Sequence, residues 1–375
     1  MSDPDQSKLQ DWLDTLPDSV SAFARSLAKP DCPGRFYPVK EGLREAGRRA
    51  ALGFSCFALK LYWTLGLWQT LEEAHRLAWI YFIQSYQLIG GKPASPLSVN
   101  AFVDEPVLTH AGRTTPVWKT LLPGLGALSA CERLLIAESK QAMATLMQVG
   151  AYPLRLYEGC PHTPKSVHYF LSRLDWKQPW TAGAQLSNLS TILTIQRREF
   201  ADICDIDRLL HGCVQLAGTM LDSESGAYFS RQRPEQHQMI NGTMKVLTAL
   251  DWLDAPIHEP RRLVDTCLAV RPQGSGCDLV DHVYVLYRCH TQDPYRSEEI
   301  AAFCDTVLHR IYLHAKSDGG FSFYQNKSIT GYYGLPISEG RPVGDLHATA
   351  LLTWALAMIF SLTGRRSANW KVIRP

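Results

Sequence analysis

The sequence predicts an all-α fold, a double-layered helical barrel (α/α toroid) of about six inner and six outer helices. Three observations favour this fold class. Alternating polar and apolar runs, which are typical of half-buried strands, rarely extend over five residues. Six segments are apolar nearly all round, and a helix without a polar face must be covered on every side. About as many amphipathic segments lie between them.

The predicted inner helices follow one another along the whole chain. Small residues recur in them and allow neighbouring helices to pack closely. Several begin near glycine-containing turns, at Gly183, Gly242, Gly276 and Gly344, as expected for chain reversals repeated round a ring. The six segments are residues 52–61, one within 128–149, 183–193, 241–250, 277–286 and 345–360.

The predicted outer helices carry charge on one side. In residues 297–315 the side chains of Ile300, Phe303 and Val307 belong to an apolar stripe that faces away from charged residues. An irregular helical protein without closure is the alternative. The other four outer segments are residues 71–88, 165–174, 206–221 and 260–270.

Two further segments are assigned within a single domain that spans residues 1–375. Residues 90–125 contain five prolines and are predicted as a long loop over one rim of the barrel. Residues 1–50 are either an N-terminal arm or extra helices of the ring.

The composition is that of a globular protein with a large core. Of its residues 46% are hydrophobic and 20% are charged, and the net charge is +2. Lys and Arg form no basic stripe, which argues against nucleic-acid binding. The longest apolar run, 348–362, is short for a membrane span and is expected to be a core helix. Ten cysteines without a Cys-x-x-Cys pair or a secretory pattern favour reduced thiols in the cytoplasm.

The candidate catalytic residues stand near the starts of inner helices, where free N–H groups and positive dipole ends suit anionic or polarised ligands. Asp278, Asp281 and His282 lie three and four residues apart, so they adjoin on one helix. Neighbouring carboxylates push their pKa values apart, which can leave one as a general acid and the other ionised. In the structural alternative, Asp278 is an N-cap and the other two join a hydrogen-bond network.

Asp345 and His347 open the last inner helix. Asp345 fits either a catalytic role or an N-cap. His347 precedes a wholly apolar stretch, so it is expected near the buried end, as an acid, a base, a ligand or a hydrogen-bonded core residue. Lys245 lies in an otherwise apolar helix, where its amine either reaches water or points into the ring to bind a phosphate or carboxylate.

Aromatic side chains gather beside glycine-rich turns. Three of them are candidate substrate-binding residues: Tyr228, Phe321 and Tyr324. Aromatic faces stabilise carbocations or stack on sugars, and they also fill cores. The remaining members of this group are Phe229, Phe323, Tyr332 and Tyr333.

Two stretches near the C-terminus resemble the repeat of the α/α-toroid superfamily, which includes terpenoid cyclases and protein prenyltransferase β subunits. They are Gly319-Gly-Phe-Ser-Phe-Tyr-Gln325 and Gly344-Asp-Leu-His-Ala-Thr349. A weaker copy is Gly226-Ala-Tyr-Phe-Ser230 with Asn241-Gly-Thr243. The resemblance extends over about residues 220–362. It implies a toroid that acts on an isoprenoid.

The chain also departs from that superfamily. It contains neither the Asp-x-Asp-Asp acid of class II cyclases nor an Asp-Asp-x-x-Asp string. His347 is similar to the zinc-binding His of the prenyltransferases, but Gly320 stands where their Cys would follow. Cys277, Asp278, His282 and His347 are residue types that can bind zinc, but they lack the close spacing of known zinc ligands. The cofactor therefore stays unknown.

Three hypotheses of function remain. The first is a terpenoid cyclase or prenyltransferase-like enzyme that acts on an isoprenoid or other apolar small molecule by carboxylate and His acid–base chemistry. The second is a carbohydrate-active (α/α)6-barrel hydrolase, lyase or epimerase, which would use carboxylate or His pairs with aromatic platforms. The third is a non-catalytic toroid that binds a ligand or a protein partner. The oligomeric state stays open.

Overall fold

The computed structural model describes residues 6–89, 96–114, 127–200, 205–230, 232–272, 274–365 and 370–375. In this part of the chain fourteen α-helices accompany one short hairpin, so the predicted all-α class is confirmed. The chain folds into two compact units. The first comprises Met1–Trp79, Pro260–Tyr332 and Pro336–Ile373, and the second Ile80–Glu259, Tyr333–Leu335 and Arg374–Pro375.

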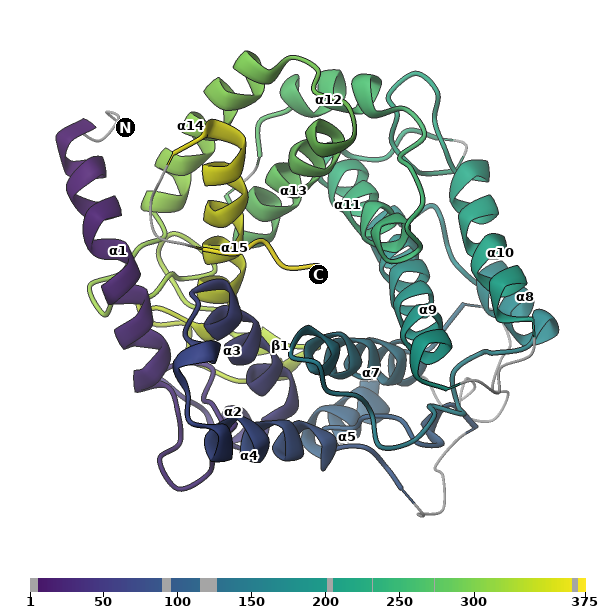
Figure 1. The fold of residues 1–375 in the computed structure, drawn as a ribbon, viewed down its shortest axis with the longest axis horizontal. Coiled ribbons are helices and arrows are strands. Elements are labelled where there is room, and N and C mark those ends of the chain that lie inside the picture. The colour runs from purple at the N-terminus through teal and green to yellow at the C-terminus, as the bar shows by residue number, and fades with distance from the viewer. Residues whose placement is uncertain are drawn as a thin grey trace. The chain divides into compact units, whose positions relative to one another are not determined.

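The first unit joins the two ends of the chain around α15. This helix packs against α13 and α3, and α14 packs against both α13 and α15 (Figure 1). The unit contains α1 (Gln6–Ser26), α2 (Glu45–Arg49), α3 (Leu52–Thr64), η1 (Trp68–Thr70), α12 (Pro260–Leu268), α13 (Gly276–Gln292), α14 (Ser297–Tyr312) and α15 (Leu346–Thr363).

The second unit is built around α9. Almost every side chain from Ala182 to Gln196 is buried, because α9 packs against α7, α11 and α10 (Figure 1). The unit contains η2 (Pro96–Ser98), α5 (Glu105–Thr114), α7 (Ala130–Gln148), α8 (Pro164–Ser172), α9 (Pro179–Glu199), α10 (Ile206–Thr219) and α11 (Gln236–Trp252). Helix α4 (Glu73–Gln84) is divided between the units by the boundary after Trp79.

Glycines set the distance between α9 and α11. A Cβ atom on Gly183 would lie 2.8 Å from the carbonyl oxygen of Gly242, and a Cβ on Gly242 would lie 2.8 Å from the carbonyl carbon of Pro179. Real Cβ atoms do not approach backbone this closely. The two helices can therefore be this near only because both positions lack a side chain.

A similar contact explains the glycine-rich turn before α15. A Cβ on Gly320 would lie 2.6 Å from the ring of Phe23, and one on Gly344 would lie 2.9 Å from the same ring. Phe23 comes from α1 and is buried. The turn therefore needs glycine because the N-terminal helix lies against it.

The predicted elements are largely present. The six inner segments appear as α3, α7, α9, α11, α13 and α15, and the five outer segments appear as α4, α8, α10, α12 and α14. Residues 1–50 contain two helices, α1 and α2.

One loop prediction is corrected in part. Residues 105–114, inside the segment predicted as a rim loop, form α5. Pro106 does not prevent this helix because it stands in the first turn, where a missing N–H costs nothing. Residues 90–95 and 115–126 of the predicted loop lie outside the described residues.

Helix α15 is the one described helix that is long and apolar enough to cross a membrane. It is a core helix of the first unit, since 67% of its 18 residues are buried inside the protein. No disulfide joins the nine cysteines that the structure describes.

Candidate functional site

The starts of α13 and α15 meet at one turn in the first unit, residues 321–324. The Gly276 N–H donates to the carbonyl of Phe323 at 2.9 Å, and the Asp345 N–H donates to the carbonyl of Phe321 at 2.8 Å. The starts of these two helices therefore lie close together.

Asp345 is wholly buried and organises this region. Its carboxylate accepts hydrogen bonds from the N–H groups of Ala348 at 2.7 Å, Phe323 at 2.8 Å and Ile329 at 3.0 Å. Burial raises the pKa of Asp345 to about 7, against the opposing effect of these donors. These contacts account for the position of Asp345 as the N-cap of α15.

Asp278, Asp281 and His282 lie on α13 as predicted, but Ser275 rather than Asp278 is the N-cap of that helix. Its hydroxyl oxygen accepts the Asp278 N–H at 3.3 Å, and the hydroxyl group donates to the Asp278 carboxylate at 2.5 Å. Ser275 is the N-cap because it immediately precedes the first helical residue, Gly276. Asp278 is half-buried, whereas Asp281 and His282 are buried at 1% and 2% exposure.

His282 is held neutral. Its Nδ1–H donates to the Asp278 carbonyl at 2.8 Å, and its ring stacks on Phe303. Burial lowers the pKa of His282 to about 4. Of the three predicted residues on α13, only Asp278 keeps partial access to solvent.

His347 is half-buried between two aromatic rings. Its imidazole stacks on Phe57 with 4.4 Å between centroids and on Phe323 with 5.5 Å. Phe321 is fully buried, so it belongs to the core. Tyr324 is 39% exposed, with the ammonium of Lys327 5.0 Å from its ring centroid.

The remaining two predicted residues belong to the second unit. Tyr228 is fully buried, and its hydroxyl makes a 3.0 Å hydrogen bond with Nδ1 of His258. Lys245 is half-buried beside Gly183. The nine predicted residues are thus divided between the two units, and within the described residues no three His, Cys, Asp or Glu side chains are grouped to hold a metal.

A pocket of about 360 Å³ opens in the second unit at the starts of two inner helices, α7 and α9. Its polar and aromatic lining comes from Arg133 of α7, from Trp180, Thr181 and Gln185 of α9, and from Tyr333. Alanines of α5, α7 and α9 and one leucine of α7 complete the wall. This volume lies within the range of about 300–1,000 Å³ that is common for small-molecule sites.

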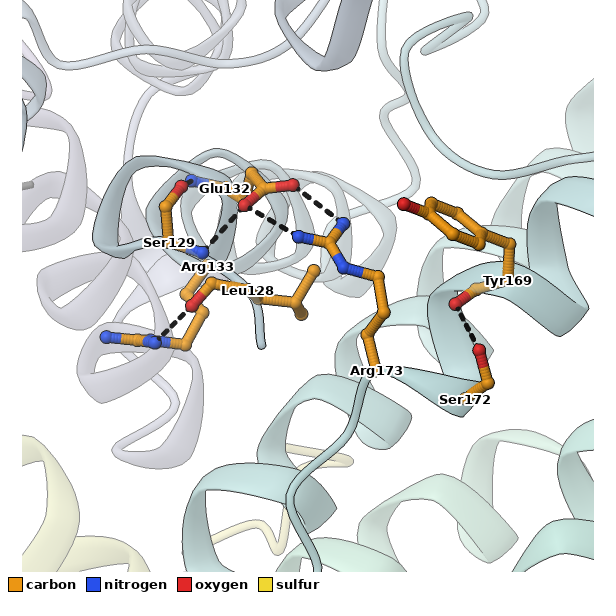
Figure 2. Close-up of polar contacts among 7 residues, drawn as sticks. All are labelled: Leu128, Ser129, Glu132, Arg133, Tyr169, Ser172 and Arg173. Atoms are coloured by element: carbon orange, nitrogen blue, oxygen red, sulfur yellow. Dashed lines mark hydrogen bonds and ion pairs between the residues drawn. The ribbon is translucent and has the colours of Figure 1, made fainter. Parts of the chain in front are cut away.

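The start of α7 is fixed by a network of polar contacts (Figure 2). Ser129 and Glu132 form a reciprocal capping box, in which each side chain accepts the other residue's N–H. Arg173 donates two hydrogen bonds to the Glu132 carboxylate, at 2.8 and 3.2 Å. Nη1 of Arg133 donates to the carbonyl of Leu128 at 2.6 Å, as Figure 2 also shows.

These contacts determine the ionisation state of Glu132 near the pocket. Burial raises the pKa of Glu132, but hydrogen bonds from Arg173 and Ser129 outweigh it, and the pKa is lowered. Glu132 is therefore ionised and committed to Arg173. Arg133 makes no ion pair with any described residue, so its positive charge remains available to the pocket.

Gln185 and Tyr333 are polar residues in the lining of the pocket. Gln185 is 5% exposed, and its Oε1 has no hydrogen-bond partner among the described residues. Tyr333 is presented in a hairpin turn between β1 (Gly331–Tyr332) and β2 (Leu335–Pro336), with a left-handed φ of 47°. Tyr333 is 49% exposed as a residue, but its hydroxyl end is desolvated, and this desolvation together with the nearby charge of Glu138 raises its pKa. The phenol is therefore protonated.

Sequence reasoning missed most of this pocket. Tyr333 is among the aromatic residues beside glycine-rich turns, whereas Arg133, Trp180 and Gln185 are not among the candidates that the sequence offers. The signal that could have found them is a position near the start of an inner helix, which all three residues share.

No protein-family model matches the sequence, and no curated protein matches it. Several solved structures are similar over most of the chain. One is an inactive variant of the α-1,6-mannanase GH76A of Salegentibacter sp. in complex with α-1,6-mannotetrose. It is 10% identical, covers 93% of this chain and 98% of that one, and has a TM-score of 0.45.

Two further similar structures are a polysaccharide lyase and a possible member of the GH105 family from Salmonella enterica serovar Paratyphi A. The lyase is 11% identical over 94% of this chain and 99% of that one, with a TM-score of 0.48. The second is 12% identical over 94% of each chain, with a TM-score of 0.40. None of the three is named for an isoprenoid.

Proposed function

We propose that this protein is a carbohydrate-active enzyme, a hydrolase, lyase or epimerase, and that the pocket of the second unit is its saccharide site. The observation that carries this proposal is the mixed lining of the pocket. Trp180 and Tyr333 offer partly exposed aromatic faces, and the buried amide of Gln185 lies beside them. Sugars present C–H faces that pack on aromatic rings and hydroxyl groups that need directional partners.

An isoprenoid fits this pocket less well. The guanidinium of Arg133 would lose water to a hydrocarbon chain without gaining an acceptor. A ligand rich in hydroxyl groups supplies acceptors to it.

The pocket supplies one neutral hydroxyl group for chemistry. Because its pKa is raised, the Tyr333 phenol stays neutral and can donate a hydrogen bond to a glycosidic or hydroxyl oxygen. Asp278 and His347 in the first unit are the half-buried members of the predicted acid–base set. They remain candidates by residue type only, since their neighbours account for their positions.

The experiment is a binding screen followed by product analysis. Neutral and acidic oligosaccharides are titrated while tryptophan fluorescence is recorded, and bound ligands are then incubated and analysed for new reducing ends, unsaturated products and epimers. Trp180→Ala should weaken saccharide binding by about tenfold or more, since stacked aromatic contacts are worth about 1–3 kcal/mol. The control Trp63→Ala alters a tryptophan in the first unit.

Two outcomes would count against the proposal. If no saccharide binds, the pocket has another ligand class. If saccharides bind equally well to Trp180→Ala, they bind outside this pocket. Binding without any product would identify a saccharide-binding protein rather than an enzyme.

A further inference from the structure

Residues 25–49 of the first unit carry a concentrated positive charge. They include seven basic residues and three acidic ones, whereas the rest of the chain contains slightly more acidic than basic residues. This segment begins in the last turn of α1, continues through a loop and ends with α2. Its basic residues are Arg25, Lys29, Arg35, Lys40, Arg44, Arg48 and Arg49.

The fold brings five of these residues into one compact area, which we call the basic patch. The Lys29 N–H donates to the Arg35 carbonyl at 2.9 Å, so the two arms of the loop lie side by side. The Ala28 N–H donates to the Arg25 carbonyl at 3.1 Å, which keeps the end of α1 close to this loop. Nη2 of Arg35 donates to the Arg48 carbonyl at 2.6 Å and places the end of α2 beside it. The basic patch consists of Arg25, Lys29, Arg35, Arg48 and Arg49.

The basic patch is not neutralised by the described part of the chain. None of its five side chains forms an ion pair with a described residue. Glu45 lies one turn before Arg48 and Arg49 on α2, but it is exposed and pairs with neither of them. Arg25, Arg48 and Arg49 are exposed, and the other two members are partly exposed. Because neighbouring like charges repel one another, an external anion would stabilise the patch.

The surroundings of the patch favour a broad anionic surface as its partner. The exposed large hydrophobic side chains of the described chain all lie outside residues 25–49. The patch therefore has no exposed ring on which nucleic-acid bases could stack and no large apolar group to insert among lipid tails.

The shape of the patch gives a second reason. It is spread over α1, the loop and α2, and it is not drawn out into the stripe that follows a nucleic-acid backbone. A bilayer with anionic headgroups presents its negative charge over an area. Clusters of about four to eight Lys and Arg residues are typical of proteins that bind such a bilayer.

We infer that the basic patch docks the protein on a membrane surface that contains anionic lipids. Each Lys or Arg near such a surface strengthens binding about fivefold, so several together suffice for attachment. Because the patch offers no large apolar side chain for insertion, the attachment is electrostatic and is reversed by salt. The basic patch shares no residue with the pocket of the second unit, so this inference does not depend on the proposed function.

The experiment is co-sedimentation of the full chain with lipid vesicles. Vesicles of phosphatidylcholine alone are compared with vesicles that contain about 30% phosphatidylserine, in about 0.1 M salt, where the Debye length is about 10 Å. The protein should bind only the anionic vesicles, and about 1 M salt should release it. The double variant Arg48→Gln/Arg49→Gln should bind the anionic vesicles about 25-fold more weakly.

The matched control is Arg208→Gln/Arg271→Gln, which removes the same charge from two exposed arginines outside the patch. It should bind anionic vesicles as wild type does. The double variant of the patch is expected to fold, because Arg48 accepts the Arg35 hydrogen bond through its carbonyl, which glutamine retains. Circular dichroism checks this, and Arg25→Gln is a second patch variant that should weaken binding about fivefold.

Three results would overturn the inference: no binding to the anionic vesicles, equal binding to both kinds of vesicle, or unchanged binding by Arg48→Gln/Arg49→Gln. A short DNA duplex is tested at the same salt concentration. If it binds more tightly than the anionic vesicles, the patch is a nucleic-acid surface and the inference is wrong. Weaker vesicle binding by the patch variants alone supports the inference, whatever the saccharide screen shows.

Discussion

Tyr333 is the residue whose chemistry the proposed function uses most directly. Its left-handed φ of 47° is unfavourable for a side chain of this size, and such strain is common at functional positions. If the phenol donates a hydrogen bond that strengthens in the transition state, Tyr333→Phe should lower turnover of an identified saccharide by about a hundredfold, with little change in affinity.

The comparison for this variant is Tyr152→Phe, an exposed tyrosine of the second unit that does not line the pocket. Steady-state rates and calorimetric affinities would be measured for both. Equal loss of affinity and turnover in Tyr333→Phe would assign the hydroxyl to binding alone, and unchanged turnover would remove Tyr333 from the chemistry.

Asp345 gives a pH dependence that can be tested in unfolding experiments. Its folded pKa of about 7 lies above the ordinary value of 3.8, because the carboxyl is buried. Between these two values the folded state binds more protons than the unfolded state. The contribution of Asp345 to the free energy of unfolding is therefore complete below pH 3.8 and falls as pH rises towards 7.

His282 acts in the opposite direction, since its folded pKa of about 4 lies below the ordinary 6.5. Its contribution is lost as pH falls through that interval. Urea unfolding of wild type, Asp345→Asn and His282→Gln, measured between about pH 4 and pH 7, separates the contribution of Asp345 from that of His282. Asp345→Asn should lack the fall in stability towards neutral pH. An identical pH profile in wild type and Asp345→Asn would mean that the carboxyl is ionised throughout.

At this scale the sequence predicted positions better than roles. Asp345 was expected at the start of its helix, where an N-cap and a catalytic acid were both open. The structure shows the N-cap contact and adds backbone donors from Phe323 and Ile329, 22 and 16 residues away in the chain. Arg133 is similar, because its availability depends on a contact between Glu132 and Arg173, which are 41 residues apart. No local pattern contains such information.

Among the elements, the crossing of α9 and α11 is the contact most sensitive to a single methyl group. Gly242→Ala should destabilise the protein by about 1–3 kcal/mol, because the added Cβ would overlap the backbone of Pro179. Gly212→Ala on α10 is the matched control, since nothing lies within 4 Å of its Cβ position. That change should be neutral or stabilising by up to about 1 kcal/mol.

Urea denaturation measures both variants. A Gly242→Ala protein as stable as wild type would mean that α9 and α11 move apart without loss, and the close crossing would then not limit the fold. Equal destabilisation by Gly212→Ala would point to a general effect of alanine rather than to this crossing.

The sequence was most informative about which segments form buried helices. Helices that are apolar on all sides were recognised as α9 and α15 because burial on every side leaves a direct mark on composition. Helix α5 was missed because it has few such residues and stands among prolines. Where a helix depends on neighbours for its stability rather than on its own pattern, sequence alone does not predict it.

In the molecule as a whole, the first unit depends on a contact between its chain ends. Phe23 of α1 is 1% exposed and lies against Gly320 and Gly344. Phe23→Ala should lower the free energy of unfolding by about 3–5 kcal/mol, through lost burial and a cavity. Tyr81→Ala, at a position that is 63% exposed, should change it by no more than about 0.5 kcal/mol.

Urea unfolding followed by circular dichroism compares these variants with wild type. A small effect of Phe23→Ala would mean that α1 contributes little to the first unit. The glycines at 320 and 344 would then require another explanation than the approach of this helix.

The order of segments in the first unit also has a consequence during synthesis on the ribosome. Residues 1–79 leave the ribosome first, but their partners in the unit begin only at residue 260. At about 5–20 residues per second, α1 and α3 wait on the order of tens of seconds for α13 and α15. The second unit, which is nearly continuous from residue 80 to 259, has its helices available earlier. The nascent N-terminal segment, with the apolar helix α3, is therefore the part of this protein on which a chaperone is expected to act.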